Sequence, residues 1–444
     1  MKSPLLFQHD RTSVLTVSPR ALLEGLFHKA VHAAHPASCL PPHLPPAPTG
    51  RLVILAAGKA GASMAAVAER HYLETLGLAP ARITGLAVTR RGYGEPTRVI
   101  PVIEAGHPVP DAAGLAATFD TLALADAAGP DDLVLVLISG GASANWIAPA
   151  VGLSLAEKQG LTRALLASGA PIGEINTLRK HLSRIKGGHL AERAHPARLV
   201  TIGISDVPGD DPAVIGSGPS VPDATTLADA RAIVARHRLD IPPTIAQALA
   251  DVRNETPKPG DPVFAGSSFV LAAKPADVFV TVEQAVREAG YESVLLGTQV
   301  EGEAREVAAA HARLARELQA QGRRAVILSG GELTVTLRGK GRGGPNQEYA
   351  LALAIALENA RGIAALAGDT DGTDGGGGSP DDPAGAFADV TTLSRARGLS
   401  LDPAAFLADN NSTEFFEKLG DLLTPGPTRT NVNDFRAILV DSPE

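Results

Sequence analysis

The 444-residue chain lacks the features that would cross-link it or hold it in a membrane. It has one cysteine, Cys39, so no internal disulfide can form. Aromatic residues make up only 4% of the chain, which is low for an all-β sandwich. No apolar run approaches the roughly 20 residues that a membrane-spanning helix needs. The apolar start is broken by His9, Asp10 and Arg11, too early for the core of a signal peptide. These absences predict a cytoplasmic protein.

A net positive charge and the common catalytic motifs are also absent. The formal net charge is −8, which offers no global attraction to nucleic acid or to an anionic membrane, so we expect neither as a partner. There is no Walker A sequence, no kinase H-R-D set and no H-E-x-x-H. A G-x-S-x-G match at Gly141 fails because Asn145 takes the last position. A kinase built from this chain would not have one of the common kinase folds.

What the sequence does contain is an alternation of strand and helix patterns. Apolar, β-branched runs at 51–57, 83–88 and 133–138 alternate with helical periodicity at 61–76 and 111–127. Strands without polar interruptions are typical of a parallel sheet that is covered on both faces. The pattern therefore predicts an α/β fold. A first helix is expected at 19–34, followed by an extended proline-rich connector at 35–50.

The alternation restarts after a Pro/Gly-rich stretch at 257–262. The later strands are expected near 269–272, 293–296, 325–328 and 363–366. Because one hydrophobic core rarely exceeds roughly 300 residues, two domains are expected. We place them at residues 1–255 and 256–444, each with a mainly parallel sheet.

Several glycine-rich loops follow predicted strands. Gly58 and Lys59 lie between a strand and a helix, where backbone N–H groups and the helix dipole attract anions. This is not a dinucleotide fingerprint, because Ala60 and Ser63 stand where glycine is required. Two further loops have glycines that allow a ligand to approach the backbone. They contain Ser139, Gly140, Gly141 and Ser143 in the first half, and Ser329, Gly330 and Gly331 in the second.

A helix predicted from residue 172 to about 194 carries polar residues beside its buried stripe. The stripe consists of Ile175, Leu178, Leu182 and Ile185. The neighbouring row consists of Asn176, Arg179, Ser183 and Lys186, followed by Gly187 and Gly188. Surface charges normally lie opposite the stripe, so this pattern favours a helix edge that lines a cleft, although snorkelling side chains would give the same pattern.

Carboxylates also cluster where predicted strands end. Asp206 lies in the turn-rich segment 205–211, and Asp369 and Asp371 lie in 368–375. Converging carboxylates are suited to bind magnesium or to act as a general base. Arg342, in the basic loop 339–344, could clamp transition-state charge, although a merely solvated loop explains the same residues.

Together these motifs resemble the glycerate 2-kinases with a C-terminal MOFRL domain, some of which are named hydroxypyruvate reductase. The matching segments cover almost the whole chain in order. They are residues 57–60, 139–144, 176–188, 205–207, 216–219, 341–348, 368–372 and 430–434. The family often has arginine where this chain has Pro345.

The resemblance implies that ATP, with Mg²⁺, phosphorylates D-glycerate at its C2 hydroxyl in a cleft between two Rossmann-like domains. Lys59 and Arg342 would then stabilise the transferring phosphoryl group, and Asp206 or Asp369 would serve the hydroxyl or the metal. We assign nucleotide binding to Gly58, Ser139, Gly140, Gly141, Ser143, Lys186, Gly187 and Gly188. We assign substrate binding to Asn176, Arg179, Ser329, Gly330, Gly331 and Asn346. The predicted metal ligands are Asp206, Asp369 and Asp371.

Two other functions remain open at the level of sequence. An NAD(P)H-dependent hydroxypyruvate reductase could meet a cofactor 2′-phosphate with Arg90 and Arg91 at the end of a strand. The carboxylate clusters argue against it, because hydride transfer does not need them. A non-catalytic sugar-acid sensor would need the pockets without the metal-binding carboxylates. The oligomeric state, including a homodimer, is left open.

Overall fold

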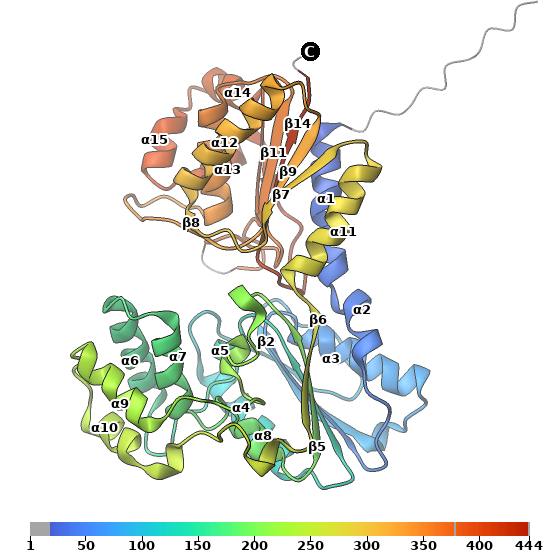
Figure 1. The fold of residues 1–444 in the computed structure, drawn as a ribbon, viewed down its shortest axis with the longest axis vertical. Coiled ribbons are helices and arrows are strands. Elements are labelled where there is room, and N and C mark those ends of the chain that lie inside the picture. The colour runs from blue at the N-terminus through green and yellow to red at the C-terminus, as the bar shows by residue number, and fades with distance from the viewer. Residues whose placement is uncertain (1–17, 377–378, 443–444) are drawn as a thin grey trace, which may run out of the picture.

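The computed structural model describes residues 18–376 and 379–442, which form two α/β domains stacked end to end (Figure 1). The first is built on a six-stranded sheet in which every pair is parallel, with the order β3-β2-β1-β4-β5-β6. Its strands are β1 (Leu52–Ala57), β2 (Ile83–Arg90), β3 (Val102–Ala105), β4 (Leu133–Ile138), β5 (Arg198–Ile204) and β6 (Ser267–Ala273).

Helices cover both faces of this sheet, as its continuous apolar strands require. Because strand side chains alternate between faces, Ile54 packs in the same core as α3 (Gly61–Arg70), whereas Leu55 packs with α4 (Ala112–Asp126) and α8 (His189–Ala194). A separate helical group encloses a core of its own beside the sheet (Figure 1). It consists of α6 (Leu155–Ala167), α7 (Ile172–His181), α9 (Leu227–Arg236) and α10 (Pro243–Ala250).

The second domain has a mixed six-stranded sheet with the order β13-β12-β11-β14-β9-β7. Only β7 and β9 pair in parallel, and the other four pairs are antiparallel. The strands are β7 (Glu292–Gly297), β9 (Ala325–Ser329), β11 (Ile363–Asp369), β12 (Gly385–Asp389), β13 (Leu422–Leu423) and β14 (Asp434–Val440). A short parallel pair, β8 (Gly302–Glu303) and β10 (Leu333–Thr334), lies outside this sheet.

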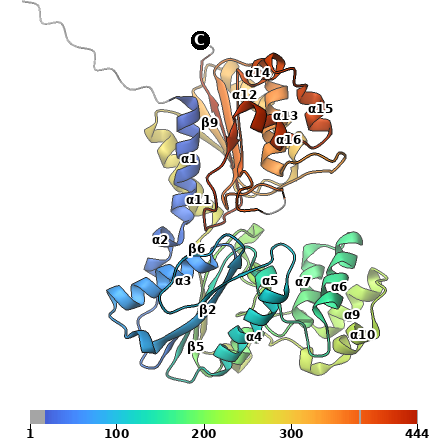
Figure 2. The same ribbon diagram turned by 180° about the vertical axis from the view of Figure 1, so that it is seen from behind.

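Helices also cover both faces of the second sheet. On one face lie α1 (Pro19–Ala34) and α11 (Pro275–Glu288), which run side by side in Figures 1 and 2. On the other lie α12 (Ala304–Ala320) and α13 (Pro345–Leu357). The remaining helices are α2 (Pro36–Cys39), α5 (Ala142–Asn145), α14 (Thr392–Gly398), α15 (Pro403–Ala408) and α16 (Ser412–Leu419).

The α/β class predicted from the sequence is confirmed, and three local predictions are corrected. The second sheet is mixed rather than mainly parallel, because apolar strand patterns do not encode direction. The helix expected at 172–194 is two helices, because Gly187 and Gly188 adopt φ values of 61° and 89° that a right-handed helix cannot contain. The expected connector at 35–50 begins with the short helix α2.

Two elements belong to a different domain from the one that the predicted boundary assigns them. β6 lies after residue 255 and yet completes the first sheet, while α1 belongs by its packing to the second domain. The division at 255 and 256 therefore does not follow the two sheets. No helix in the described ranges is long and apolar enough to cross a membrane.

Candidate active site

The candidate site begins where β1 and β4 lie next to each other in the first sheet. The strand order reverses at this point, so the loops after the two strands diverge and leave a crevice at the carboxyl edge, the usual ligand position in open α/β sheets. The Lys59 N–H donates to the carbonyl of Gly140 (2.8 Å), and the Ala60 N–H donates to Ser139 Oγ (2.9 Å). The two predicted glycine loops of the first domain are thus joined into one structure.

Lys59 extends from this crevice to the second domain. Its Nζ lies 2.5 Å from Asp371 Oδ2, and the carboxylate of Asp371 also accepts from the Thr373 N–H (2.7 Å). Burial works against the charge on Lys59, but the attraction of Asp371, Asp369 and Asp206 outweighs it and raises the pKa of the ammonium. Lys59 is therefore a fixed positive charge at the junction of the domains.

Asp206 follows β5 and lies directly beside Gly140. A methyl group built on Gly140 would come within 1.8 Å of Asp206 Oδ2, so glycine is required for the loop and the carboxylate to be neighbours. From the second domain, Asn431 Nδ2 donates to Asp206 Oδ2 (2.7 Å) and Asn433 Nδ2 to its backbone carbonyl (2.6 Å). Desolvation raises the pKa of Asp206 despite the opposing effect of Lys59.

Asp369, at the end of β11, adds a further carboxylate. Its Oδ1 accepts the Asp371 N–H (2.9 Å), and burial together with the charge of Asp371 holds its pKa well above the usual range. Lys59 has the opposite effect on Asp371, whose pKa is lowered although burial alone would raise it. Within residues 18–376 and 379–442, no three His, Cys, Asp or Glu side chains are grouped so that they could hold a metal ion. The role of Asp206, Asp369 and Asp371 as metal ligands stays a prediction, and in this structure Asp371 pairs with Lys59.

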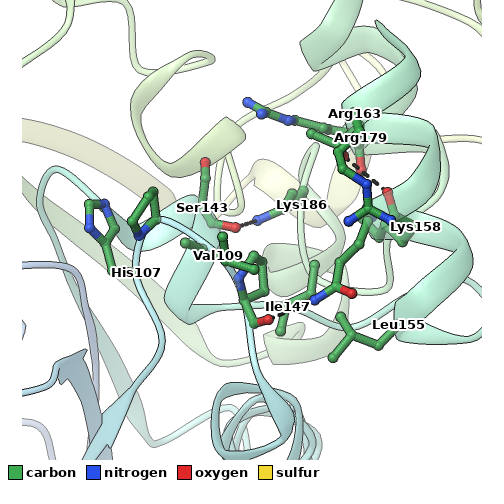
Figure 3. Close-up of a pocket in the computed structure, with 15 residues that line it drawn as sticks. His107, Val109, Ser143, Ile147, Leu155, Lys158, Arg163, Arg179 and Lys186 are labelled. Carbon is green, nitrogen blue, oxygen red and sulfur yellow. Dashed lines mark hydrogen bonds between the residues drawn. The ribbon is translucent and has the colours of Figure 1, made fainter. Parts of the chain in front are cut away.

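A cavity of about 440 Å³ opens beside Gly141 in the first domain (Figure 3). Lys186, whose Nζ donates to the carbonyls of Ser143 and Trp146 (2.8 Å each), lies in its wall. Burial, reinforced by nearby cations, lowers the pKa of Lys186 well below its usual range. The lining residues are His107, Pro108, Val109, Pro110, Gly141, Ser143, Ala144, Ile147, Leu155, Lys158, Gln159, Thr162, Arg163, Arg179 and Lys186. Asn176 is buried next to Arg179, which donates to its Oδ1 (3.4 Å).

Three predicted site residues lie away from this cluster. The amides of Gly187 and Gly188 donate to the carbonyls of Ser217 (3.0 Å) and Gly218 (2.8 Å), so they are not free to bind a phosphate. Their role is to turn the chain from α7 to α8. Arg342 is exposed and pairs with Glu417 (3.3 Å), also exposed, on α16. The structure does not bring Arg342 to Lys59.

The predicted residues of the second domain form a buried network. Arg436 donates to Ser329 Oγ (3.1 Å) and to the carbonyl of Gly330 (2.5 Å) and pairs with Asp434 (2.7 Å). Asn346 Nδ2 donates to Asp434 Oδ1 (2.6 Å). The carbonyl of Gly331 accepts the Asp434 N–H (3.2 Å). Most of these groups satisfy one another, which favours a supporting role for them, but Asn346 Oδ1 is buried without a hydrogen-bond partner among the described residues.

The structure places at the site several residues to which the sequence alone assigned no part in phosphoryl transfer. Asn431 and Asn433 precede β14, and only its antiparallel pairing with β11 brings them to Asp206. His107 follows β3, a strand end that the sequence could have indicated, and burial beside Lys59 lowers its pKa to about 3. Arg90 is buried and donates to Thr373 Oγ1 (3.0 Å).

Arg90 and Arg91 therefore do not form the predicted phosphate site of a reductase. Arg90 is engaged by the second domain, and Arg91 pairs with Asp111. The two arginines that favoured a cofactor 2′-phosphate in the sequence are thus both paired with protein groups.

The parallel sheet with a crevice at its strand-order reversal, and the charged junction with a second α/β domain, define a two-domain α/β enzyme. The chain belongs to the family of glycerate 2-kinases with a C-terminal MOFRL domain. Residues 22–250 match the family described as "Domain of unknown function (DUF4147)", and residues 325–434 match the MOFRL family.

The relatives carry two kinds of name. A "Putative hydroxypyruvate reductase" of Agrobacterium vitis is 46% identical, over 96% of this chain and 95% of its own. The D-glycerate 2-kinase of Thermotoga maritima is 38% identical, over 94% of this chain and 97% of its own. The crystal structure of glycerate kinase from Thermotoga maritima superposes with a TM-score of 0.83 at 37% identity, over 94% of this chain and 98% of that chain.

Proposed function

We propose that the protein is an ATP-dependent D-glycerate 2-kinase. It transfers the γ-phosphoryl group of ATP to the C2 hydroxyl of D-glycerate and releases ADP and 2-phosphoglycerate. The observation that carries the proposal is the placement of a cation, Lys59, and a carboxylate, Asp206, on adjoining strand-end loops that meet at Gly140. The relatives named glycerate kinase support the same reaction.

Asp206 acts as the general base in this proposal. A raised pKa brings a carboxylate nearer to the operating pH, where proton acceptance is most effective. Asp206 takes the proton of the C2 hydroxyl as the oxygen attacks phosphorus, and the bond to ADP breaks. Asn431 holds the carboxylate in position.

Lys59 stabilises the charge that develops on the transferring phosphoryl oxygens. Its burial makes this interaction stronger than it would be in water. The hydrogen bond from the Lys59 N–H to the carbonyl of Gly140 holds the backbone from which the side chain extends. In the arrangement described here Lys59 is paired with Asp371, so a phosphoryl group competes with Asp371 for the ammonium.

Asp369 is suited to hold Mg²⁺, which leaves Asp206 free to accept the proton. Mg²⁺ in kinases is usually held by one or two protein carboxylates together with phosphate oxygens and water, so a protein cluster of three carboxylates is not required. Burial first, and then the charge of Asp371, raises the pKa of Asp369 and of Asp206, so negative charge at this edge would be stabilised by a dication. When bound there, Mg²⁺ would supply positive charge that reduces the repulsion among the phosphate oxygens.

The reaction is tested by supplying substrates in pairs. We expect ADP release that requires D-glycerate and Mg²⁺, and a product that ³¹P and ¹H NMR identify as 2-phosphoglycerate. Oxidation of NADH or NADPH with hydroxypyruvate would instead establish the reductase suggested by the name of the Agrobacterium vitis relative. A protein that binds glycerate and turns over neither pair would be a sensor, and the kinase proposal would be wrong.

A further inference from the structure

The cavity beside Gly141 is built entirely from the first domain. Its lining comes from the loop after β3, from Gly141, helix α5 and the loop that follows it, from helices α6 and α7, and from Lys186, with no residue beyond 186 (Figure 3). It therefore exists independently of how the second domain is placed. The Gly141 end of the cavity adjoins two charged or polar side chains, because a Cβ at Gly141 would lie 3.4 Å from Lys59 Cγ and 3.0 Å from the His107 ring.

The cavity is larger than glycerate alone requires. A volume of about 440 Å³ lies in the range of pockets that enclose drug-sized ligands, whereas glycerate has three carbon atoms. Its lower wall in Figure 3 includes the apolar side chains of Val109, Ile147 and Leu155. Such a wall suits a ring system and has nothing to offer a small hydroxy acid.

The opposite wall carries positive charge without any acid. Lys158, Arg163, Arg179 and Lys186 all line the cavity, and its fifteen described lining residues include no Asp or Glu. Buried cations are normally paired, because an unpaired buried charge costs free energy. Here burial and the neighbouring Arg179 lower the pKa of Lys158 to about 7. A bound polyanion would relieve the repulsion among these cations.

The two lysines are held in place by backbone carbonyls rather than by carboxylates. Lys158 Nζ donates to the carbonyls of Arg179 (3.2 Å) and Leu182 (2.6 Å), and Lys186 Nζ donates to those of Ser143 and Trp146. In the protonated form, which a bound anion favours, each lysine has three N–H donors and retains one for that anion. The side chains are thus ordered in advance for an anionic ligand, at little further cost in entropy.

We propose that this cavity binds the nucleoside triphosphate, with the phosphate chain along Lys158, Arg179 and Lys186 and the nucleoside against Val109, Ile147 and Leu155. The γ-phosphate end then lies at Gly141, beside Lys59. The proposal rests on the proposed kinase function. It reassigns Arg179, which the sequence suggested for glycerate, to the nucleotide, and it adds α6 to the nucleotide site.

The test narrows the cavity without touching its charges. Thr162 lies half-buried on α6 in the cavity wall, whereas Ala156 is exposed on the same helix and does not line it. In the full chain, Thr162→Phe should weaken binding of a non-hydrolysable ATP analogue with Mg²⁺, measured by calorimetry, by at least about tenfold. It should raise the KM for ATP in parallel and leave the KM for D-glycerate unchanged. Ala156→Phe should alter none of these values.

A second pair of variants replaces exposed arginines, so that the test does not depend on correct folding of Thr162→Phe. Arg163 is exposed at the cavity, and Arg313 is exposed on α12, far from it in sequence and in a different domain. Arg163→Gln should weaken binding of the ATP analogue by about tenfold, as expected when a charge-assisted hydrogen bond is lost, and Arg313→Gln should not.

Two outcomes are distinguishable. If the cavity variants raise the KM for glycerate while leaving analogue binding intact, the cavity belongs to the acceptor and the inference is wrong, although the kinase proposal stands. If the wild-type chain forms no phosphoglycerate, the kinase proposal fails, and the calorimetry still decides whether a nucleotide occupies the cavity.

Discussion

At the scale of single residues, Gly140 contacts both the loop that carries Lys59 and the carboxylate of Asp206. A Cβ there would lie 1.8 Å from Asp206 Oδ2 and 2.5 Å from Asn431 Nδ2, so Gly140→Ala must displace the carboxylate. Because misplacement of a reacting group by about 1 Å can cost roughly 10²-fold in rate, we expect kcat to fall by about that factor. Gly173→Ala, where no atom lies within 4 Å of the new Cβ, is the matched control. Equal kcat values for the two variants would contradict the role of Gly140.

Lys59 and Asp371 allow stability and catalysis to be separated. Lys59→Met leaves the buried Asp371 carboxylate without its closest cation, and removing one partner of a buried pair costs about 3–5 kcal/mol. The same variant should lower kcat by at least about 10²-fold, since a charge aimed at the transition state is lost.

The double variant Lys59→Met/Asp371→Asn is the informative comparison. It removes the orphaned charge, so most of the lost stability should return while kcat stays low. Equilibrium urea unfolding and initial rates measure the two effects. Recovery of activity together with stability would show that Lys59 serves only to join the domains.

The sequence predicted those site residues that lie on short loops directly after strands. Gly58, Lys59, Gly140 and Asp206 belong to this group, because the carboxyl ends of parallel strands share one edge. Asn431 could not be found in this way. It approaches Asp206 only because β14 runs antiparallel to β11, and an apolar strand pattern is the same in either direction. The role of Arg342 stays a prediction, because a basic glycine loop has the same sequence whether or not it faces a ligand, and here its side chain pairs with Glu417.

At the scale of elements, local patterns predicted where helices and strands occur better than where they are interrupted. α1 lies at the predicted residues, because Ser18 caps its N-terminus and Pro19 takes the first helical position. The α7–α8 region was predicted as one helix because its apolar spacing continues through the break. Ile185, in the break itself, is fully buried, so tertiary packing satisfies the same pattern without a helix.

The contact between helices α12 and α13 predicts a pH dependence of stability. His311 on α12 is buried, its Nδ1 lies 2.8 Å from the Tyr349 hydroxyl on α13, and burial with the charge of Arg436 lowers its pKa from 6.5 to about 4. Between these values the unfolded chain binds a proton that the folded chain does not, so stability falls as the pH falls.

The free energy of unfolding that is lost through His311 should amount to up to about 2 kcal/mol between pH 6.5 and about pH 5. His311→Gln removes it, so urea midpoints measured across this range should depend less on pH than those of the wild type. His28→Gln, at an exposed position on α1, should leave the wild-type dependence in place. An unchanged slope in His311→Gln would show that His311 is protonated in the folded protein.

At the scale of the whole molecule, the N-terminal helix belongs to the C-terminal domain. α1 buries Leu23, Leu26 and Phe27 at 0–1% exposure, and the Phe27 ring meets Phe435 edge-on with 6.0 Å between centroids. Arg20 pairs with Asp421 (2.9 Å). Burial of three large side chains contributes roughly 5–9 kcal/mol, which is comparable with the whole stability of a domain. The core of the second domain is therefore incomplete without α1.

We expect residues 275–442 expressed alone to show no cooperative unfolding transition, because the sheet face that α1 covers is left exposed. Adding residues 18–35 after residue 442 through a flexible Gly/Ser linker should restore the transition. The join is feasible because Ser18 and Asp441 line the same surface pocket, so the two ends of the described chain are close. As a control, the same chain with Leu23→Asp and Phe27→Asp in the appended helix should not fold. Cooperative unfolding of 275–442 alone, at the same urea midpoint as the chain with the appended helix, would show that α1 is dispensable.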